Sequence, residues 1–271
     1  MRILSTFSPV FMSWRPVDCH AHSTFSDGEL APAAVAARAA ALGIRGSITD
    51  HMSRDVARSI TSVDQIRRYL DAIEPLGVLR GGEFCWHDHL WRELPDDLVH
   101  RFTHRVGSLH AVRMPNGSLV RAFSRKLPTE LTLEAYMAAH TASFEALTRE
   151  MPVDIFAHPT LVTLPFRTRD IDELWTEERE ARMVDALYDA GIAFEISSRY
   201  PPHERLVRRA VDRGVRISLG SDGHTHAQVG DIKRPLAMAR ALGVRDEDLY
   251  DPERHGSKTG GIRTVPAARA G

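Results

Sequence analysis

The chain has 271 residues and a formal net charge of −1, so it offers no electrostatic basis for nonspecific binding along a nucleic-acid duplex. Its two cysteines, Cys19 and Cys85, cannot build a disulfide framework. Their scarcity beside 14 histidines fits a reducing cytoplasm, where we expect the protein to reside. No apolar run is long enough to span a bilayer, and no membrane partner is expected.

Segments typical of strands and helices alternate along the chain. Apolar strand-like runs are expected at residues 17–22, 44–51, 76–84, 105–112, 153–158, 192–199 and 215–222. Helical periodicity and end signals predict helices at residues 32–43, 62–77, 132–150, 176–191, 202–214 and 229–243. An insertion with turn signals occupies residues 113–126. No linker divides these alternating β and α units, which favours one domain built on a parallel sheet.

We place this domain at residues 17–250, after an N-terminal arm of residues 1–16 and before a flexible tail of residues 251–271. Polar clusters fall at the carboxyl ends of the strand-like runs, where parallel barrels carry their active sites. An α/β fold with a closed or slightly open (β/α) barrel of seven strands is therefore favoured. A doubly wound sheet is less favoured, because its functional strand ends would gather at one crevice.

All seven strand-like runs end on side chains that bind metals. These side chains are His20 and His22, His51, Glu83, His110, His158, Glu195, and Asp222 with His224. No single loop could supply so many imidazole and carboxylate ligands, so the pattern predicts a polynuclear metal centre and a metal hydrolase. A mixed nitrogen and oxygen donor set without thiolate fits Zn, Mn or Fe.

The segment DCHAHSTFSDG, which opens the first unit, is the most informative motif. Alternate residues of a strand share a face, so Asp18, His20 and His22 point the same way and the two histidines can hold one ion. Asp27 follows after a short turn and can reach a neighbouring ion. Asp18 is placed to accept a hydrogen bond from a ligand imidazole. Cys19 points to the opposite face, as a small core residue.

Six motifs, taken together, resemble those of the PHP (polymerase and histidinol phosphatase) superfamily. They are HAHSTFSDG, ITDH, GGEF, GSLH, AHPT and SDGH, in the order of that family, between about residues 17 and 245. GSLH followed by AHPTLVTLPFR is most similar to the histidinol-phosphatase branch. Two positions depart from the pattern of that branch: Ala111 stands where a second histidine often follows, and Asp27 where several members have histidine.

This resemblance implies a distorted seven-stranded barrel that binds two or three divalent ions. By motif, a first ion would take His20, His22, Glu83 and Asp222. Glu83 would bridge to a second ion bound by His110 and His158. Asp27, His51 and His224 would hold a third.

The expected chemistry is hydrolysis by a water or hydroxide that bridges the ions, with Glu83 and Asp222 as catalytic ligands. Glu83 suits a bridge because its carboxylate has two oxygens. His226 is a candidate for protonating the leaving oxygen. A phosphate dianion also needs positive charge beyond the metals, and Arg167 and Arg199 follow strand ends on the correct face.

Other polar residues near these motifs are expected to play lesser parts. His87 and His89 are assigned to the pocket rim or to solvent. Glu195 and Asp50 are expected to support ligands more than to bind metal directly. His104 and His203 are assigned structural roles.

Three functions remain open from the sequence. The leading one is a phosphatase acting on a small phosphorylated metabolite, with L-histidinol phosphate as first candidate. A PHP-type phosphodiesterase, nuclease or nucleotide phosphatase is kept by the loop of Trp86 and Trp91 and by arginines of the insertion. The third is a non-catalytic metal-binding PHP module, which the complete ligand set argues against.

Overall fold

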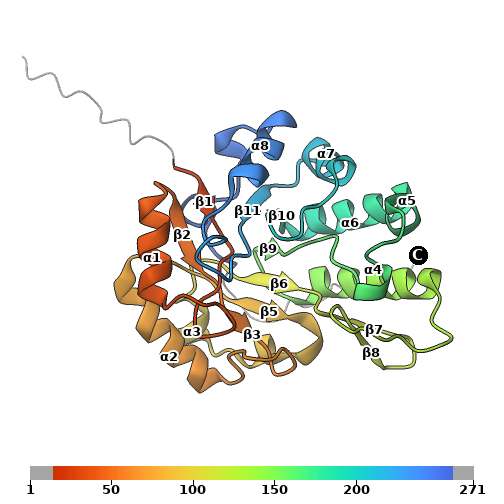
Figure 1. Cartoon of the computed structure of the whole chain (residues 1–271), viewed down its shortest axis with the longest axis horizontal. Coiled ribbons are helices and arrows are strands. Elements are labelled where there is room, and N and C mark those ends of the chain that lie inside the picture. The colour runs from red at the N-terminus through yellow and green to blue at the C-terminus, as the bar shows by residue number, and fades with distance from the viewer. Residues whose placement is uncertain (1–14, 259–271) are drawn as a thin grey trace, which may run out of the picture.

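The computed structural model describes residues 15–258 as parallel strands surrounded by helices (Figure 1). One sheet has three parallel strands in the order β1-β2-β4, and a second has six in the order β11-β10-β9-β6-β5-β3. The strands of these sheets are β1 (Val17–Asp18), β2 (Arg45–Ile48), β3 (His51–Met52), β4 (Leu79–Arg80), β5 (Glu83–Cys85), β6 (Val106–Ser108), β9 (Ile155–Phe156), β10 (Ala193–Ser197) and β11 (Ile217–Gly220). Parallel strands alternating with helices confirm the predicted α/β class.

Two of the expected strands are each interrupted once. Residues 44–51 form β2 and β3, and residues 76–84 form β4 and the start of β5. Backbone pairing continues across the interruptions: Thr49 N donates to Ala21 O (2.7 Å) and Glu83 N donates to Asp50 O (3.0 Å). Gly81 lies so close to Thr49 that a Cβ there would be 2.4 Å from its Oγ1. The two sheets therefore adjoin where the strands carry the predicted ligands.

The segment after β1 also pairs with the end of β11. Cys19 N donates to Leu219 O (2.9 Å), Asp222 N to His20 O (2.7 Å) and His22 N to Gly223 O (2.9 Å). These bonds bring the first and last motifs of the sequence side by side, although about 200 residues separate them along the chain.

The helices lie outside the strands, and three of the longer ones begin at hydroxyl caps. They are α1 (Pro32–Ala41), α2 (Val63–Ile73), α3 (Asp96–Val99), α4 (Leu133–Glu150), α5 (Ile171–Leu174), α6 (Glu177–Ala190), α7 (Glu204–Arg213), α8 (Lys233–Ala241) and α9 (Pro252–His255). Ser62, Thr132 and Thr176 accept hydrogen bonds from backbone N–H groups at the starts of α2, α4 and α6. No helix among residues 15–258 is long and apolar enough to cross a membrane.

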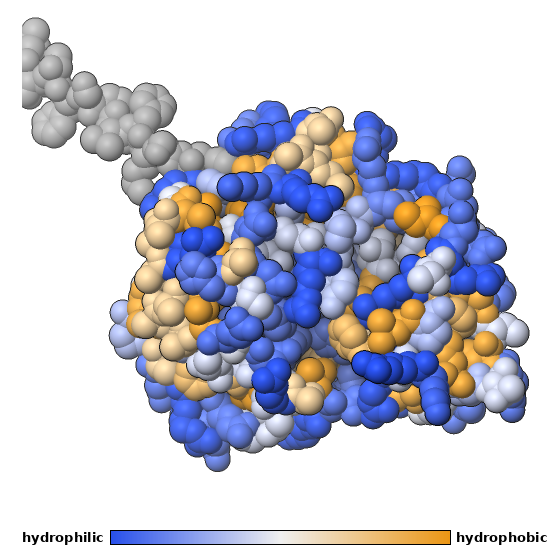
Figure 2. Space-filling model, viewed as in Figure 1, coloured by the Kyte–Doolittle hydropathy of each residue, from blue (hydrophilic) through white to orange (hydrophobic). Residues whose placement is uncertain are grey.

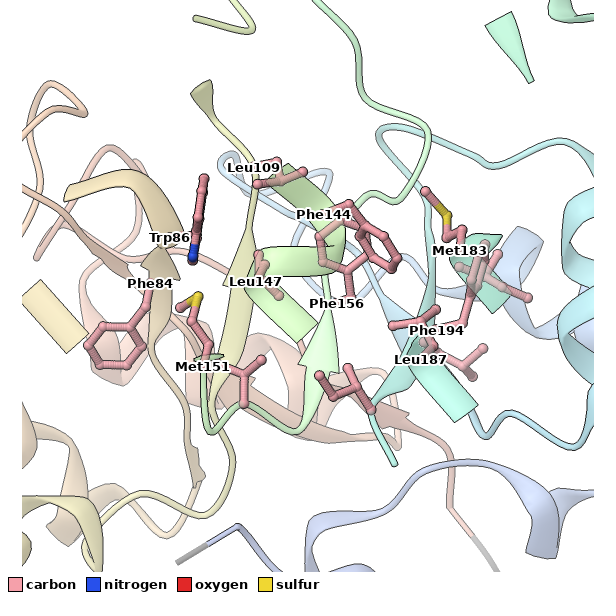
Figure 3. Packing of buried hydrophobic residues seen from close by; sticks show 14 of the residues in the cluster. Phe84, Trp86, Leu109, Phe144, Leu147, Met151, Phe156, Met183, Leu187 and Phe194 are labelled. Atoms are coloured by element: carbon pink, nitrogen blue, oxygen red, sulfur yellow. The ribbon is translucent and has the colours of Figure 1, made fainter. Parts of the chain in front are cut away.

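Apolar side chains of the long helices fill the space against the sheet. Figure 3 shows Phe144 of α4, Phe156 of β9 and Phe194 of β10 close together. The rings of Phe144 and Phe156 lie 4.7 Å apart in an edge-on arrangement, which is favourable for aromatic pairs. Hydrophilic residues cover much of the face seen in Figure 2, with apolar patches between them. The packing of these buried side chains thus fixes the sheet strands whose ends carry the predicted ligands.

The insertion at residues 113–126 forms most of a hairpin beside the sheet. Its strands are β7 (Ala111–Arg113) and β8 (Leu119–Arg121), which pair antiparallel. Ala122 N donates to His110 O (2.8 Å), and Leu164 N donates to Ala122 O (2.9 Å). The hairpin is thereby attached to the strand ends that carry His110 and His158.

Residues 251–258, where the flexible tail was expected to begin, contact the rest of the domain. Asp251 is buried, caps α9 by accepting from Glu253 N (3.0 Å), and pairs with Arg45. Lys258 N donates to Asp154 Oδ1 (2.7 Å), so this segment attaches to the domain. Residues 259–271, and residues 1–14 of the expected arm, lie outside the described residues.

Candidate metal centre

The structure brings all nine predicted ligands into one connected cluster. They are His20, His22, Asp27, His51, Glu83, His110, His158, Asp222 and His224. In each, a ring nitrogen or carboxylate oxygen lies within 3.5 Å of a ring nitrogen or carboxylate oxygen of another member. The cause is the parallel arrangement, since the carboxyl ends of parallel strands meet at one edge.

Glu83 lies at the centre of this cluster and is fully buried. Its Oε1 is 3.1 Å from His158 Nε2 and 3.4 Å from His110 Nε2. Its Oε2 is 2.5 Å from His51 Nδ1 and 3.5 Å from His20 Nε2. Burial alone would raise the pKa of Glu83, but the surrounding imidazoles outweigh it and hold that pKa well below its usual range. Each oxygen of this carboxylate therefore faces a different pair of histidines.

The other two carboxylates lie between histidines as well. His22 Nε2 is 3.3 Å from Asp222 Oδ1 and 3.1 Å from His20 Nε2. Asp27 Oδ1 is 3.1 Å from His224 Nε2. Burial opposes ionisation of Asp222, but the hydrogen bond with His22 and the nearby imidazoles lower its pKa. The cluster therefore contains several ionised carboxylates and is suited to cations.

The donor atoms fit a centre with more than one ion. Three groups of ligand atoms lie mutually within 4.8 Å: His22, Asp27, His51 and His224; His20, His22 and Asp222; and His51, Glu83 and His110. His51 Nδ1 and Glu83 Oε2 are buried without a hydrogen-bond partner among the described residues, although they are close together. Buried polar atoms normally have partners, and a cation would supply one here. These groups differ from the implied sets: His22 and His51 each belong to two of them, whereas Glu83 belongs to one and His158 to none.

The protonation of the histidines reflects the same crowding. Burial lowers the pKa of His22 to about 3, with His51 contributing. At His20 and His51 the net pKa shift is upward, although burial acts to lower it. The carboxylates of Glu195 and Glu83 outweigh burial at His20, and that of Glu83 outweighs it at His51. A bound cation would replace those protons, because ligand imidazoles must be neutral.

Glu195 supports two of the predicted ligands at once. It is fully buried; its Oε1 lies 2.8 Å from His20 Nδ1 and its Oε2 accepts from His158 N (2.7 Å). Asp50 accepts from Ser23 N (2.8 Å) and Ser23 Oγ (2.6 Å), which fixes the turn that leads to Asp27. Both residues thus lie where the sequence placed supporting carboxylates.

Asp18 acts differently from the prediction. It accepts from the backbone N–H of His20 (3.2 Å), from Ser221 N (2.8 Å) and Oγ (2.6 Å), and from Gly230 N (3.1 Å), and it contacts no imidazole among the described residues. Loop donors from the end of the chain occupy this carboxylate instead. Burial raises the pKa of Asp18 to about 6.

Cys85 is a neighbour of the cluster that the sequence analysis did not consider. Its Sγ lies 3.0 Å from His110 Nδ1, and Ser108 Oγ lies 3.3 Å from the same atom. Cys85 follows Glu83 by two positions in β5, so the alternation of strand faces was a usable signal for it.

His158 and Asp222 have positive φ angles of 34° and 49°, a strained backbone that often accompanies functional sites.

A cavity of about 440 Å³ opens over the cluster, and six of the nine predicted ligands line it. The rest of its wall comes from Asp55–Ala57, from Arg121 with Phe123 and Ser124, and from Arg199 with Tyr200. A larger hollow of about 630 Å³ near Gly191 and Gly214 contains no predicted ligand. The smaller cavity is the candidate substrate site, since it alone of the two reaches the cluster.

The predicted substrate-binding residues lie differently from one another. Arg199 lines the cavity and its Nη1 contacts His224 Nδ1. Arg167 does not line it; its Nε and Nη2 donate to the carbonyls of Val162 (2.9 Å) and Ala122 (3.1 Å). His226 is exposed and is not among the lining residues, contrary to its predicted place beside the leaving group.

The remaining histidines are mostly structural. His87 is buried, not at the rim as expected, and its Nε2 lies 2.9 Å from Asp55 Oδ2. His104 is buried, with Nε2 2.8 Å from Cys19 O, and His203 Nε2 lies 2.6 Å from Glu180 Oε1. His89 is partly buried.

Among solved structures, the chain is similar to histidinol phosphate phosphatase from Lactococcus lactis subsp. lactis Il1403, complexed with zinc, L-histidinol and phosphate. The TM-score is 0.63 and the identity 16%, over 85% of this chain and 95% of that one. The two chains share a fold. This confirms, for the fold, the likeness expected from the motifs.

A second likeness is too weak to support an argument. It is to a two-domain protein from Bacteroides vulgatus ATCC 8482 that contains a predicted PHP-like metal-dependent phosphoesterase. The TM-score is 0.37 at 17% identity, over 79% of this chain and 53% of that one. No protein-family model matches the sequence, and no curated protein matches it.

Proposed function

We propose that this protein is a PHP-type, metal-dependent phosphatase that hydrolyses the phosphate monoester of a small metabolite, with L-histidinol phosphate as the first candidate. The observation that carries the proposal is the convergence of nine nitrogen- and oxygen-bearing side chains beneath a cavity of about 440 Å³, eight of them in groups with mutually close ligand atoms and His158 against Glu83. The similar phosphatase holds zinc, L-histidinol and phosphate, which supports both the metal and the substrate class.

Two or three divalent ions (Zn, Mn or Fe) would be held by His20, His22, Asp27, His51, Glu83, His110, His158, Asp222 and His224. When bound, such ions lower the pKa of water and stabilise negative charge on a transferring phosphoryl group. Glu83 is the bridging candidate, because its two oxygens face different histidines. Asp222, whose lowered pKa keeps it ionised, adds a second catalytic carboxylate.

Arg199 is the chain's own candidate for holding the phosphate. It lines the cavity beside His224, and guanidinium groups donate two parallel hydrogen bonds to phosphate oxygens. The cavity walls, being formed by three separate segments, would hold the ester against the cluster and limit the access of bulk water. Orientation of this kind is a major part of phosphoryl-transfer catalysis.

We also interpret the fold as a closed seven-stranded barrel spanning residues 17–250. Support comes from the pairing of residues 19–22 with the end of β11 and from the bonds that join the two sheets at Thr49 and Glu83. Such a barrel places the metal cluster at its carboxyl end.

The nuclease alternative loses one of its two supports. Trp86 and Trp91 are buried, with exposed fractions of 6% and 5%, so neither offers a ring for stacking a base. Arg125 and Lys126, which follow β8 at the end of the insertion, are exposed and keep the second support.

The deciding experiment loads the purified protein with Mn or Zn and measures phosphate release from L-histidinol phosphate, a nucleoside bisphosphate and a short oligonucleotide. Release from L-histidinol phosphate alone supports the proposal. Cleavage of the oligonucleotide supports the nuclease alternative. Bound metal without turnover of any of the three supports a non-catalytic module.

A further inference from the structure

Phe123 is an exposed aromatic side chain next to the candidate metal centre. Its exposed fraction is 50%, and large exposed apolar side chains are few among residues 15–258: Phe123, Ile171 and Tyr188. Of these, Phe123 alone lines the cavity over the cluster. When a ligand covers a solvent-exposed apolar ring at such a place, the burial of apolar surface favours binding.

The ring of Phe123 is held in position from behind. The guanidinium of Arg167 lies over two rings, 4.9 Å from the centroid of Phe123 and 5.5 Å from that of Tyr200. The same guanidinium is tied to the carbonyls of Val162 and Ala122. Arg167 is thus a positioning residue that joins the hairpin to the segment after β10, and it presents the two rings as one aromatic wall.

This aromatic wall, formed by Phe123 and Tyr200, lies beside the predicted ligands. The centroid of Phe123 is 6.3 Å from that of His110, and the centroid of Tyr200 is 5.8 Å from that of His158. Val56 and Ala57 add small apolar groups elsewhere on the cavity lining. A phosphate bound at the cluster would therefore place its alcohol part against the rings.

We propose that Phe123 selects the substrate by stacking against a planar aromatic group in the alcohol part of the phosphate ester. The inference rests on the proposed phosphatase function and narrows its substrate class. A flat ring buries apolar area on Phe123 at little loss of hydration. A polyhydroxylated chain, such as that of a sugar phosphate, would instead leave hydroxyl groups unpaired against the wall. Both an imidazole and a nucleobase satisfy this chemistry.

The test compares amino-alcohol phosphates with and without a ring-bearing side chain: L-histidinol phosphate and L-phenylalaninol phosphate carry one, and ethanolamine phosphate does not. Adenosine 5′-monophosphate distinguishes a nucleobase from a small ring. The wild type should favour the ring-bearing amino alcohols. Phe123→Ala should reduce kcat/KM for them by about tenfold, mainly through KM, and leave ethanolamine phosphate nearly unchanged. Phe123→Trp should retain the preference, and Phe123→Leu should lose part of it.

Tyr188→Ala is the matched control, because Tyr188 is similarly exposed and lies at the other hollow. Equal kcat/KM for ring-bearing and ring-free esters, or an equal loss for all esters in Phe123→Ala, overturns the inference while leaving the phosphatase proposal intact. If no ester is hydrolysed, the phosphatase proposal fails by itself. Saturation-transfer NMR with L-phenylalaninol then reads the stacking directly: ring signals present in the wild type and lost in Phe123→Ala support it, and their absence from the wild type overturns it.

Discussion

The carboxylate of Glu195 lies against the imidazole of His20, with 2.8 Å between Oε1 and Nδ1. A carboxylate at Nδ1 holds a proton there, so that Nε2 is the nitrogen that would bind an ion after losing its own proton, the arrangement of a metal-binding histidine. The second oxygen of Glu195 accepts from the backbone of His158 (2.7 Å). One buried side chain therefore orients ligands from two strands.

Glu195→Gln should weaken metal binding without unfolding the protein. The amide keeps one acceptor oxygen but opposes the N–H of His158 with an NH₂ group, so one of the two bonds is lost. We expect metal affinity to fall by about 10- to 100-fold. Competition with a chelator, followed by metal analysis, measures this. Glu204→Gln, at an exposed position of α7, is the control, and equal affinity in both variants would contradict the role of Glu195.

Glu83→Ala should remove more than one ion. Its two oxygens face different histidine pairs, so its loss opens two coordination spheres. We expect about two ions fewer per chain by elemental analysis, whereas His224→Ala, at the edge of the cluster, should lose about one. Full metal content in Glu83→Ala would show that this carboxylate does not bridge.

Arg199→Ala should raise KM by about tenfold while the metal content stays constant, since the side chain would donate to the phosphate and not to an ion. The inhibition constant of inorganic phosphate should rise by the same factor. Arg199→Lys keeps the positive charge but lacks the two parallel N–H donors of a guanidinium, and it should raise KM to an intermediate degree. Because Arg199 contacts His224, loss of metal in Arg199→Ala would instead assign it a role in holding that ligand.

His140 should make stability depend on pH, independently of the metal centre. It is buried in α4 between Tyr136 and Trp175, and burial lowers its pKa from 6.5 to about 4. The unfolded chain therefore binds more protons below pH 6.5, and the contribution is full above that pH and lost as pH falls toward 4.

His140→Gln should remove this dependence. Between pH 7.5 and 5, the variant should lose about 2 kcal/mol less of its free energy of unfolding than the wild type loses. Urea unfolding at both pH values measures the difference. The buried histidines of the cluster are present in both proteins, so their contribution cancels. Identical pH profiles would mean that the pKa of His140 does not differ between the folded and the unfolded protein.

The regular parts of the structure were predictable because they depend on local pattern. Ser62 and Thr176 precede helical periodicity, and both cap helices. Most residues of the candidate cluster were predictable for a related reason: they lie at or just after strand ends, which parallel strands bring together, whereas Asp27 lies in a turn beyond the first strand. His20 and His158, far apart in the chain, needed no further information to be placed at one site.

Some placements could not be read locally. Arg167 and His226 follow strand ends as Arg199 and His224 do, yet Arg167 is held by carbonyls of Val162 and Ala122 and His226 faces solvent. The direction of a loop side chain depends on which distant groups compete for its donors. Asp18 shows the same effect: its carboxylate was expected to accept a hydrogen bond from an imidazole, but it accepts from Ser221 N and Gly230 N.

The sequence by itself determined which residues could bind metal and that they would gather at one edge, because strand period and parallel order are properties of local pattern. Only the tertiary structure decided the wall of the cavity, where Phe123 of the hairpin, Tyr200 after β10 and Arg167 meet. That meeting depends on packing between segments about 30 to 80 residues apart, and no local preference encodes it.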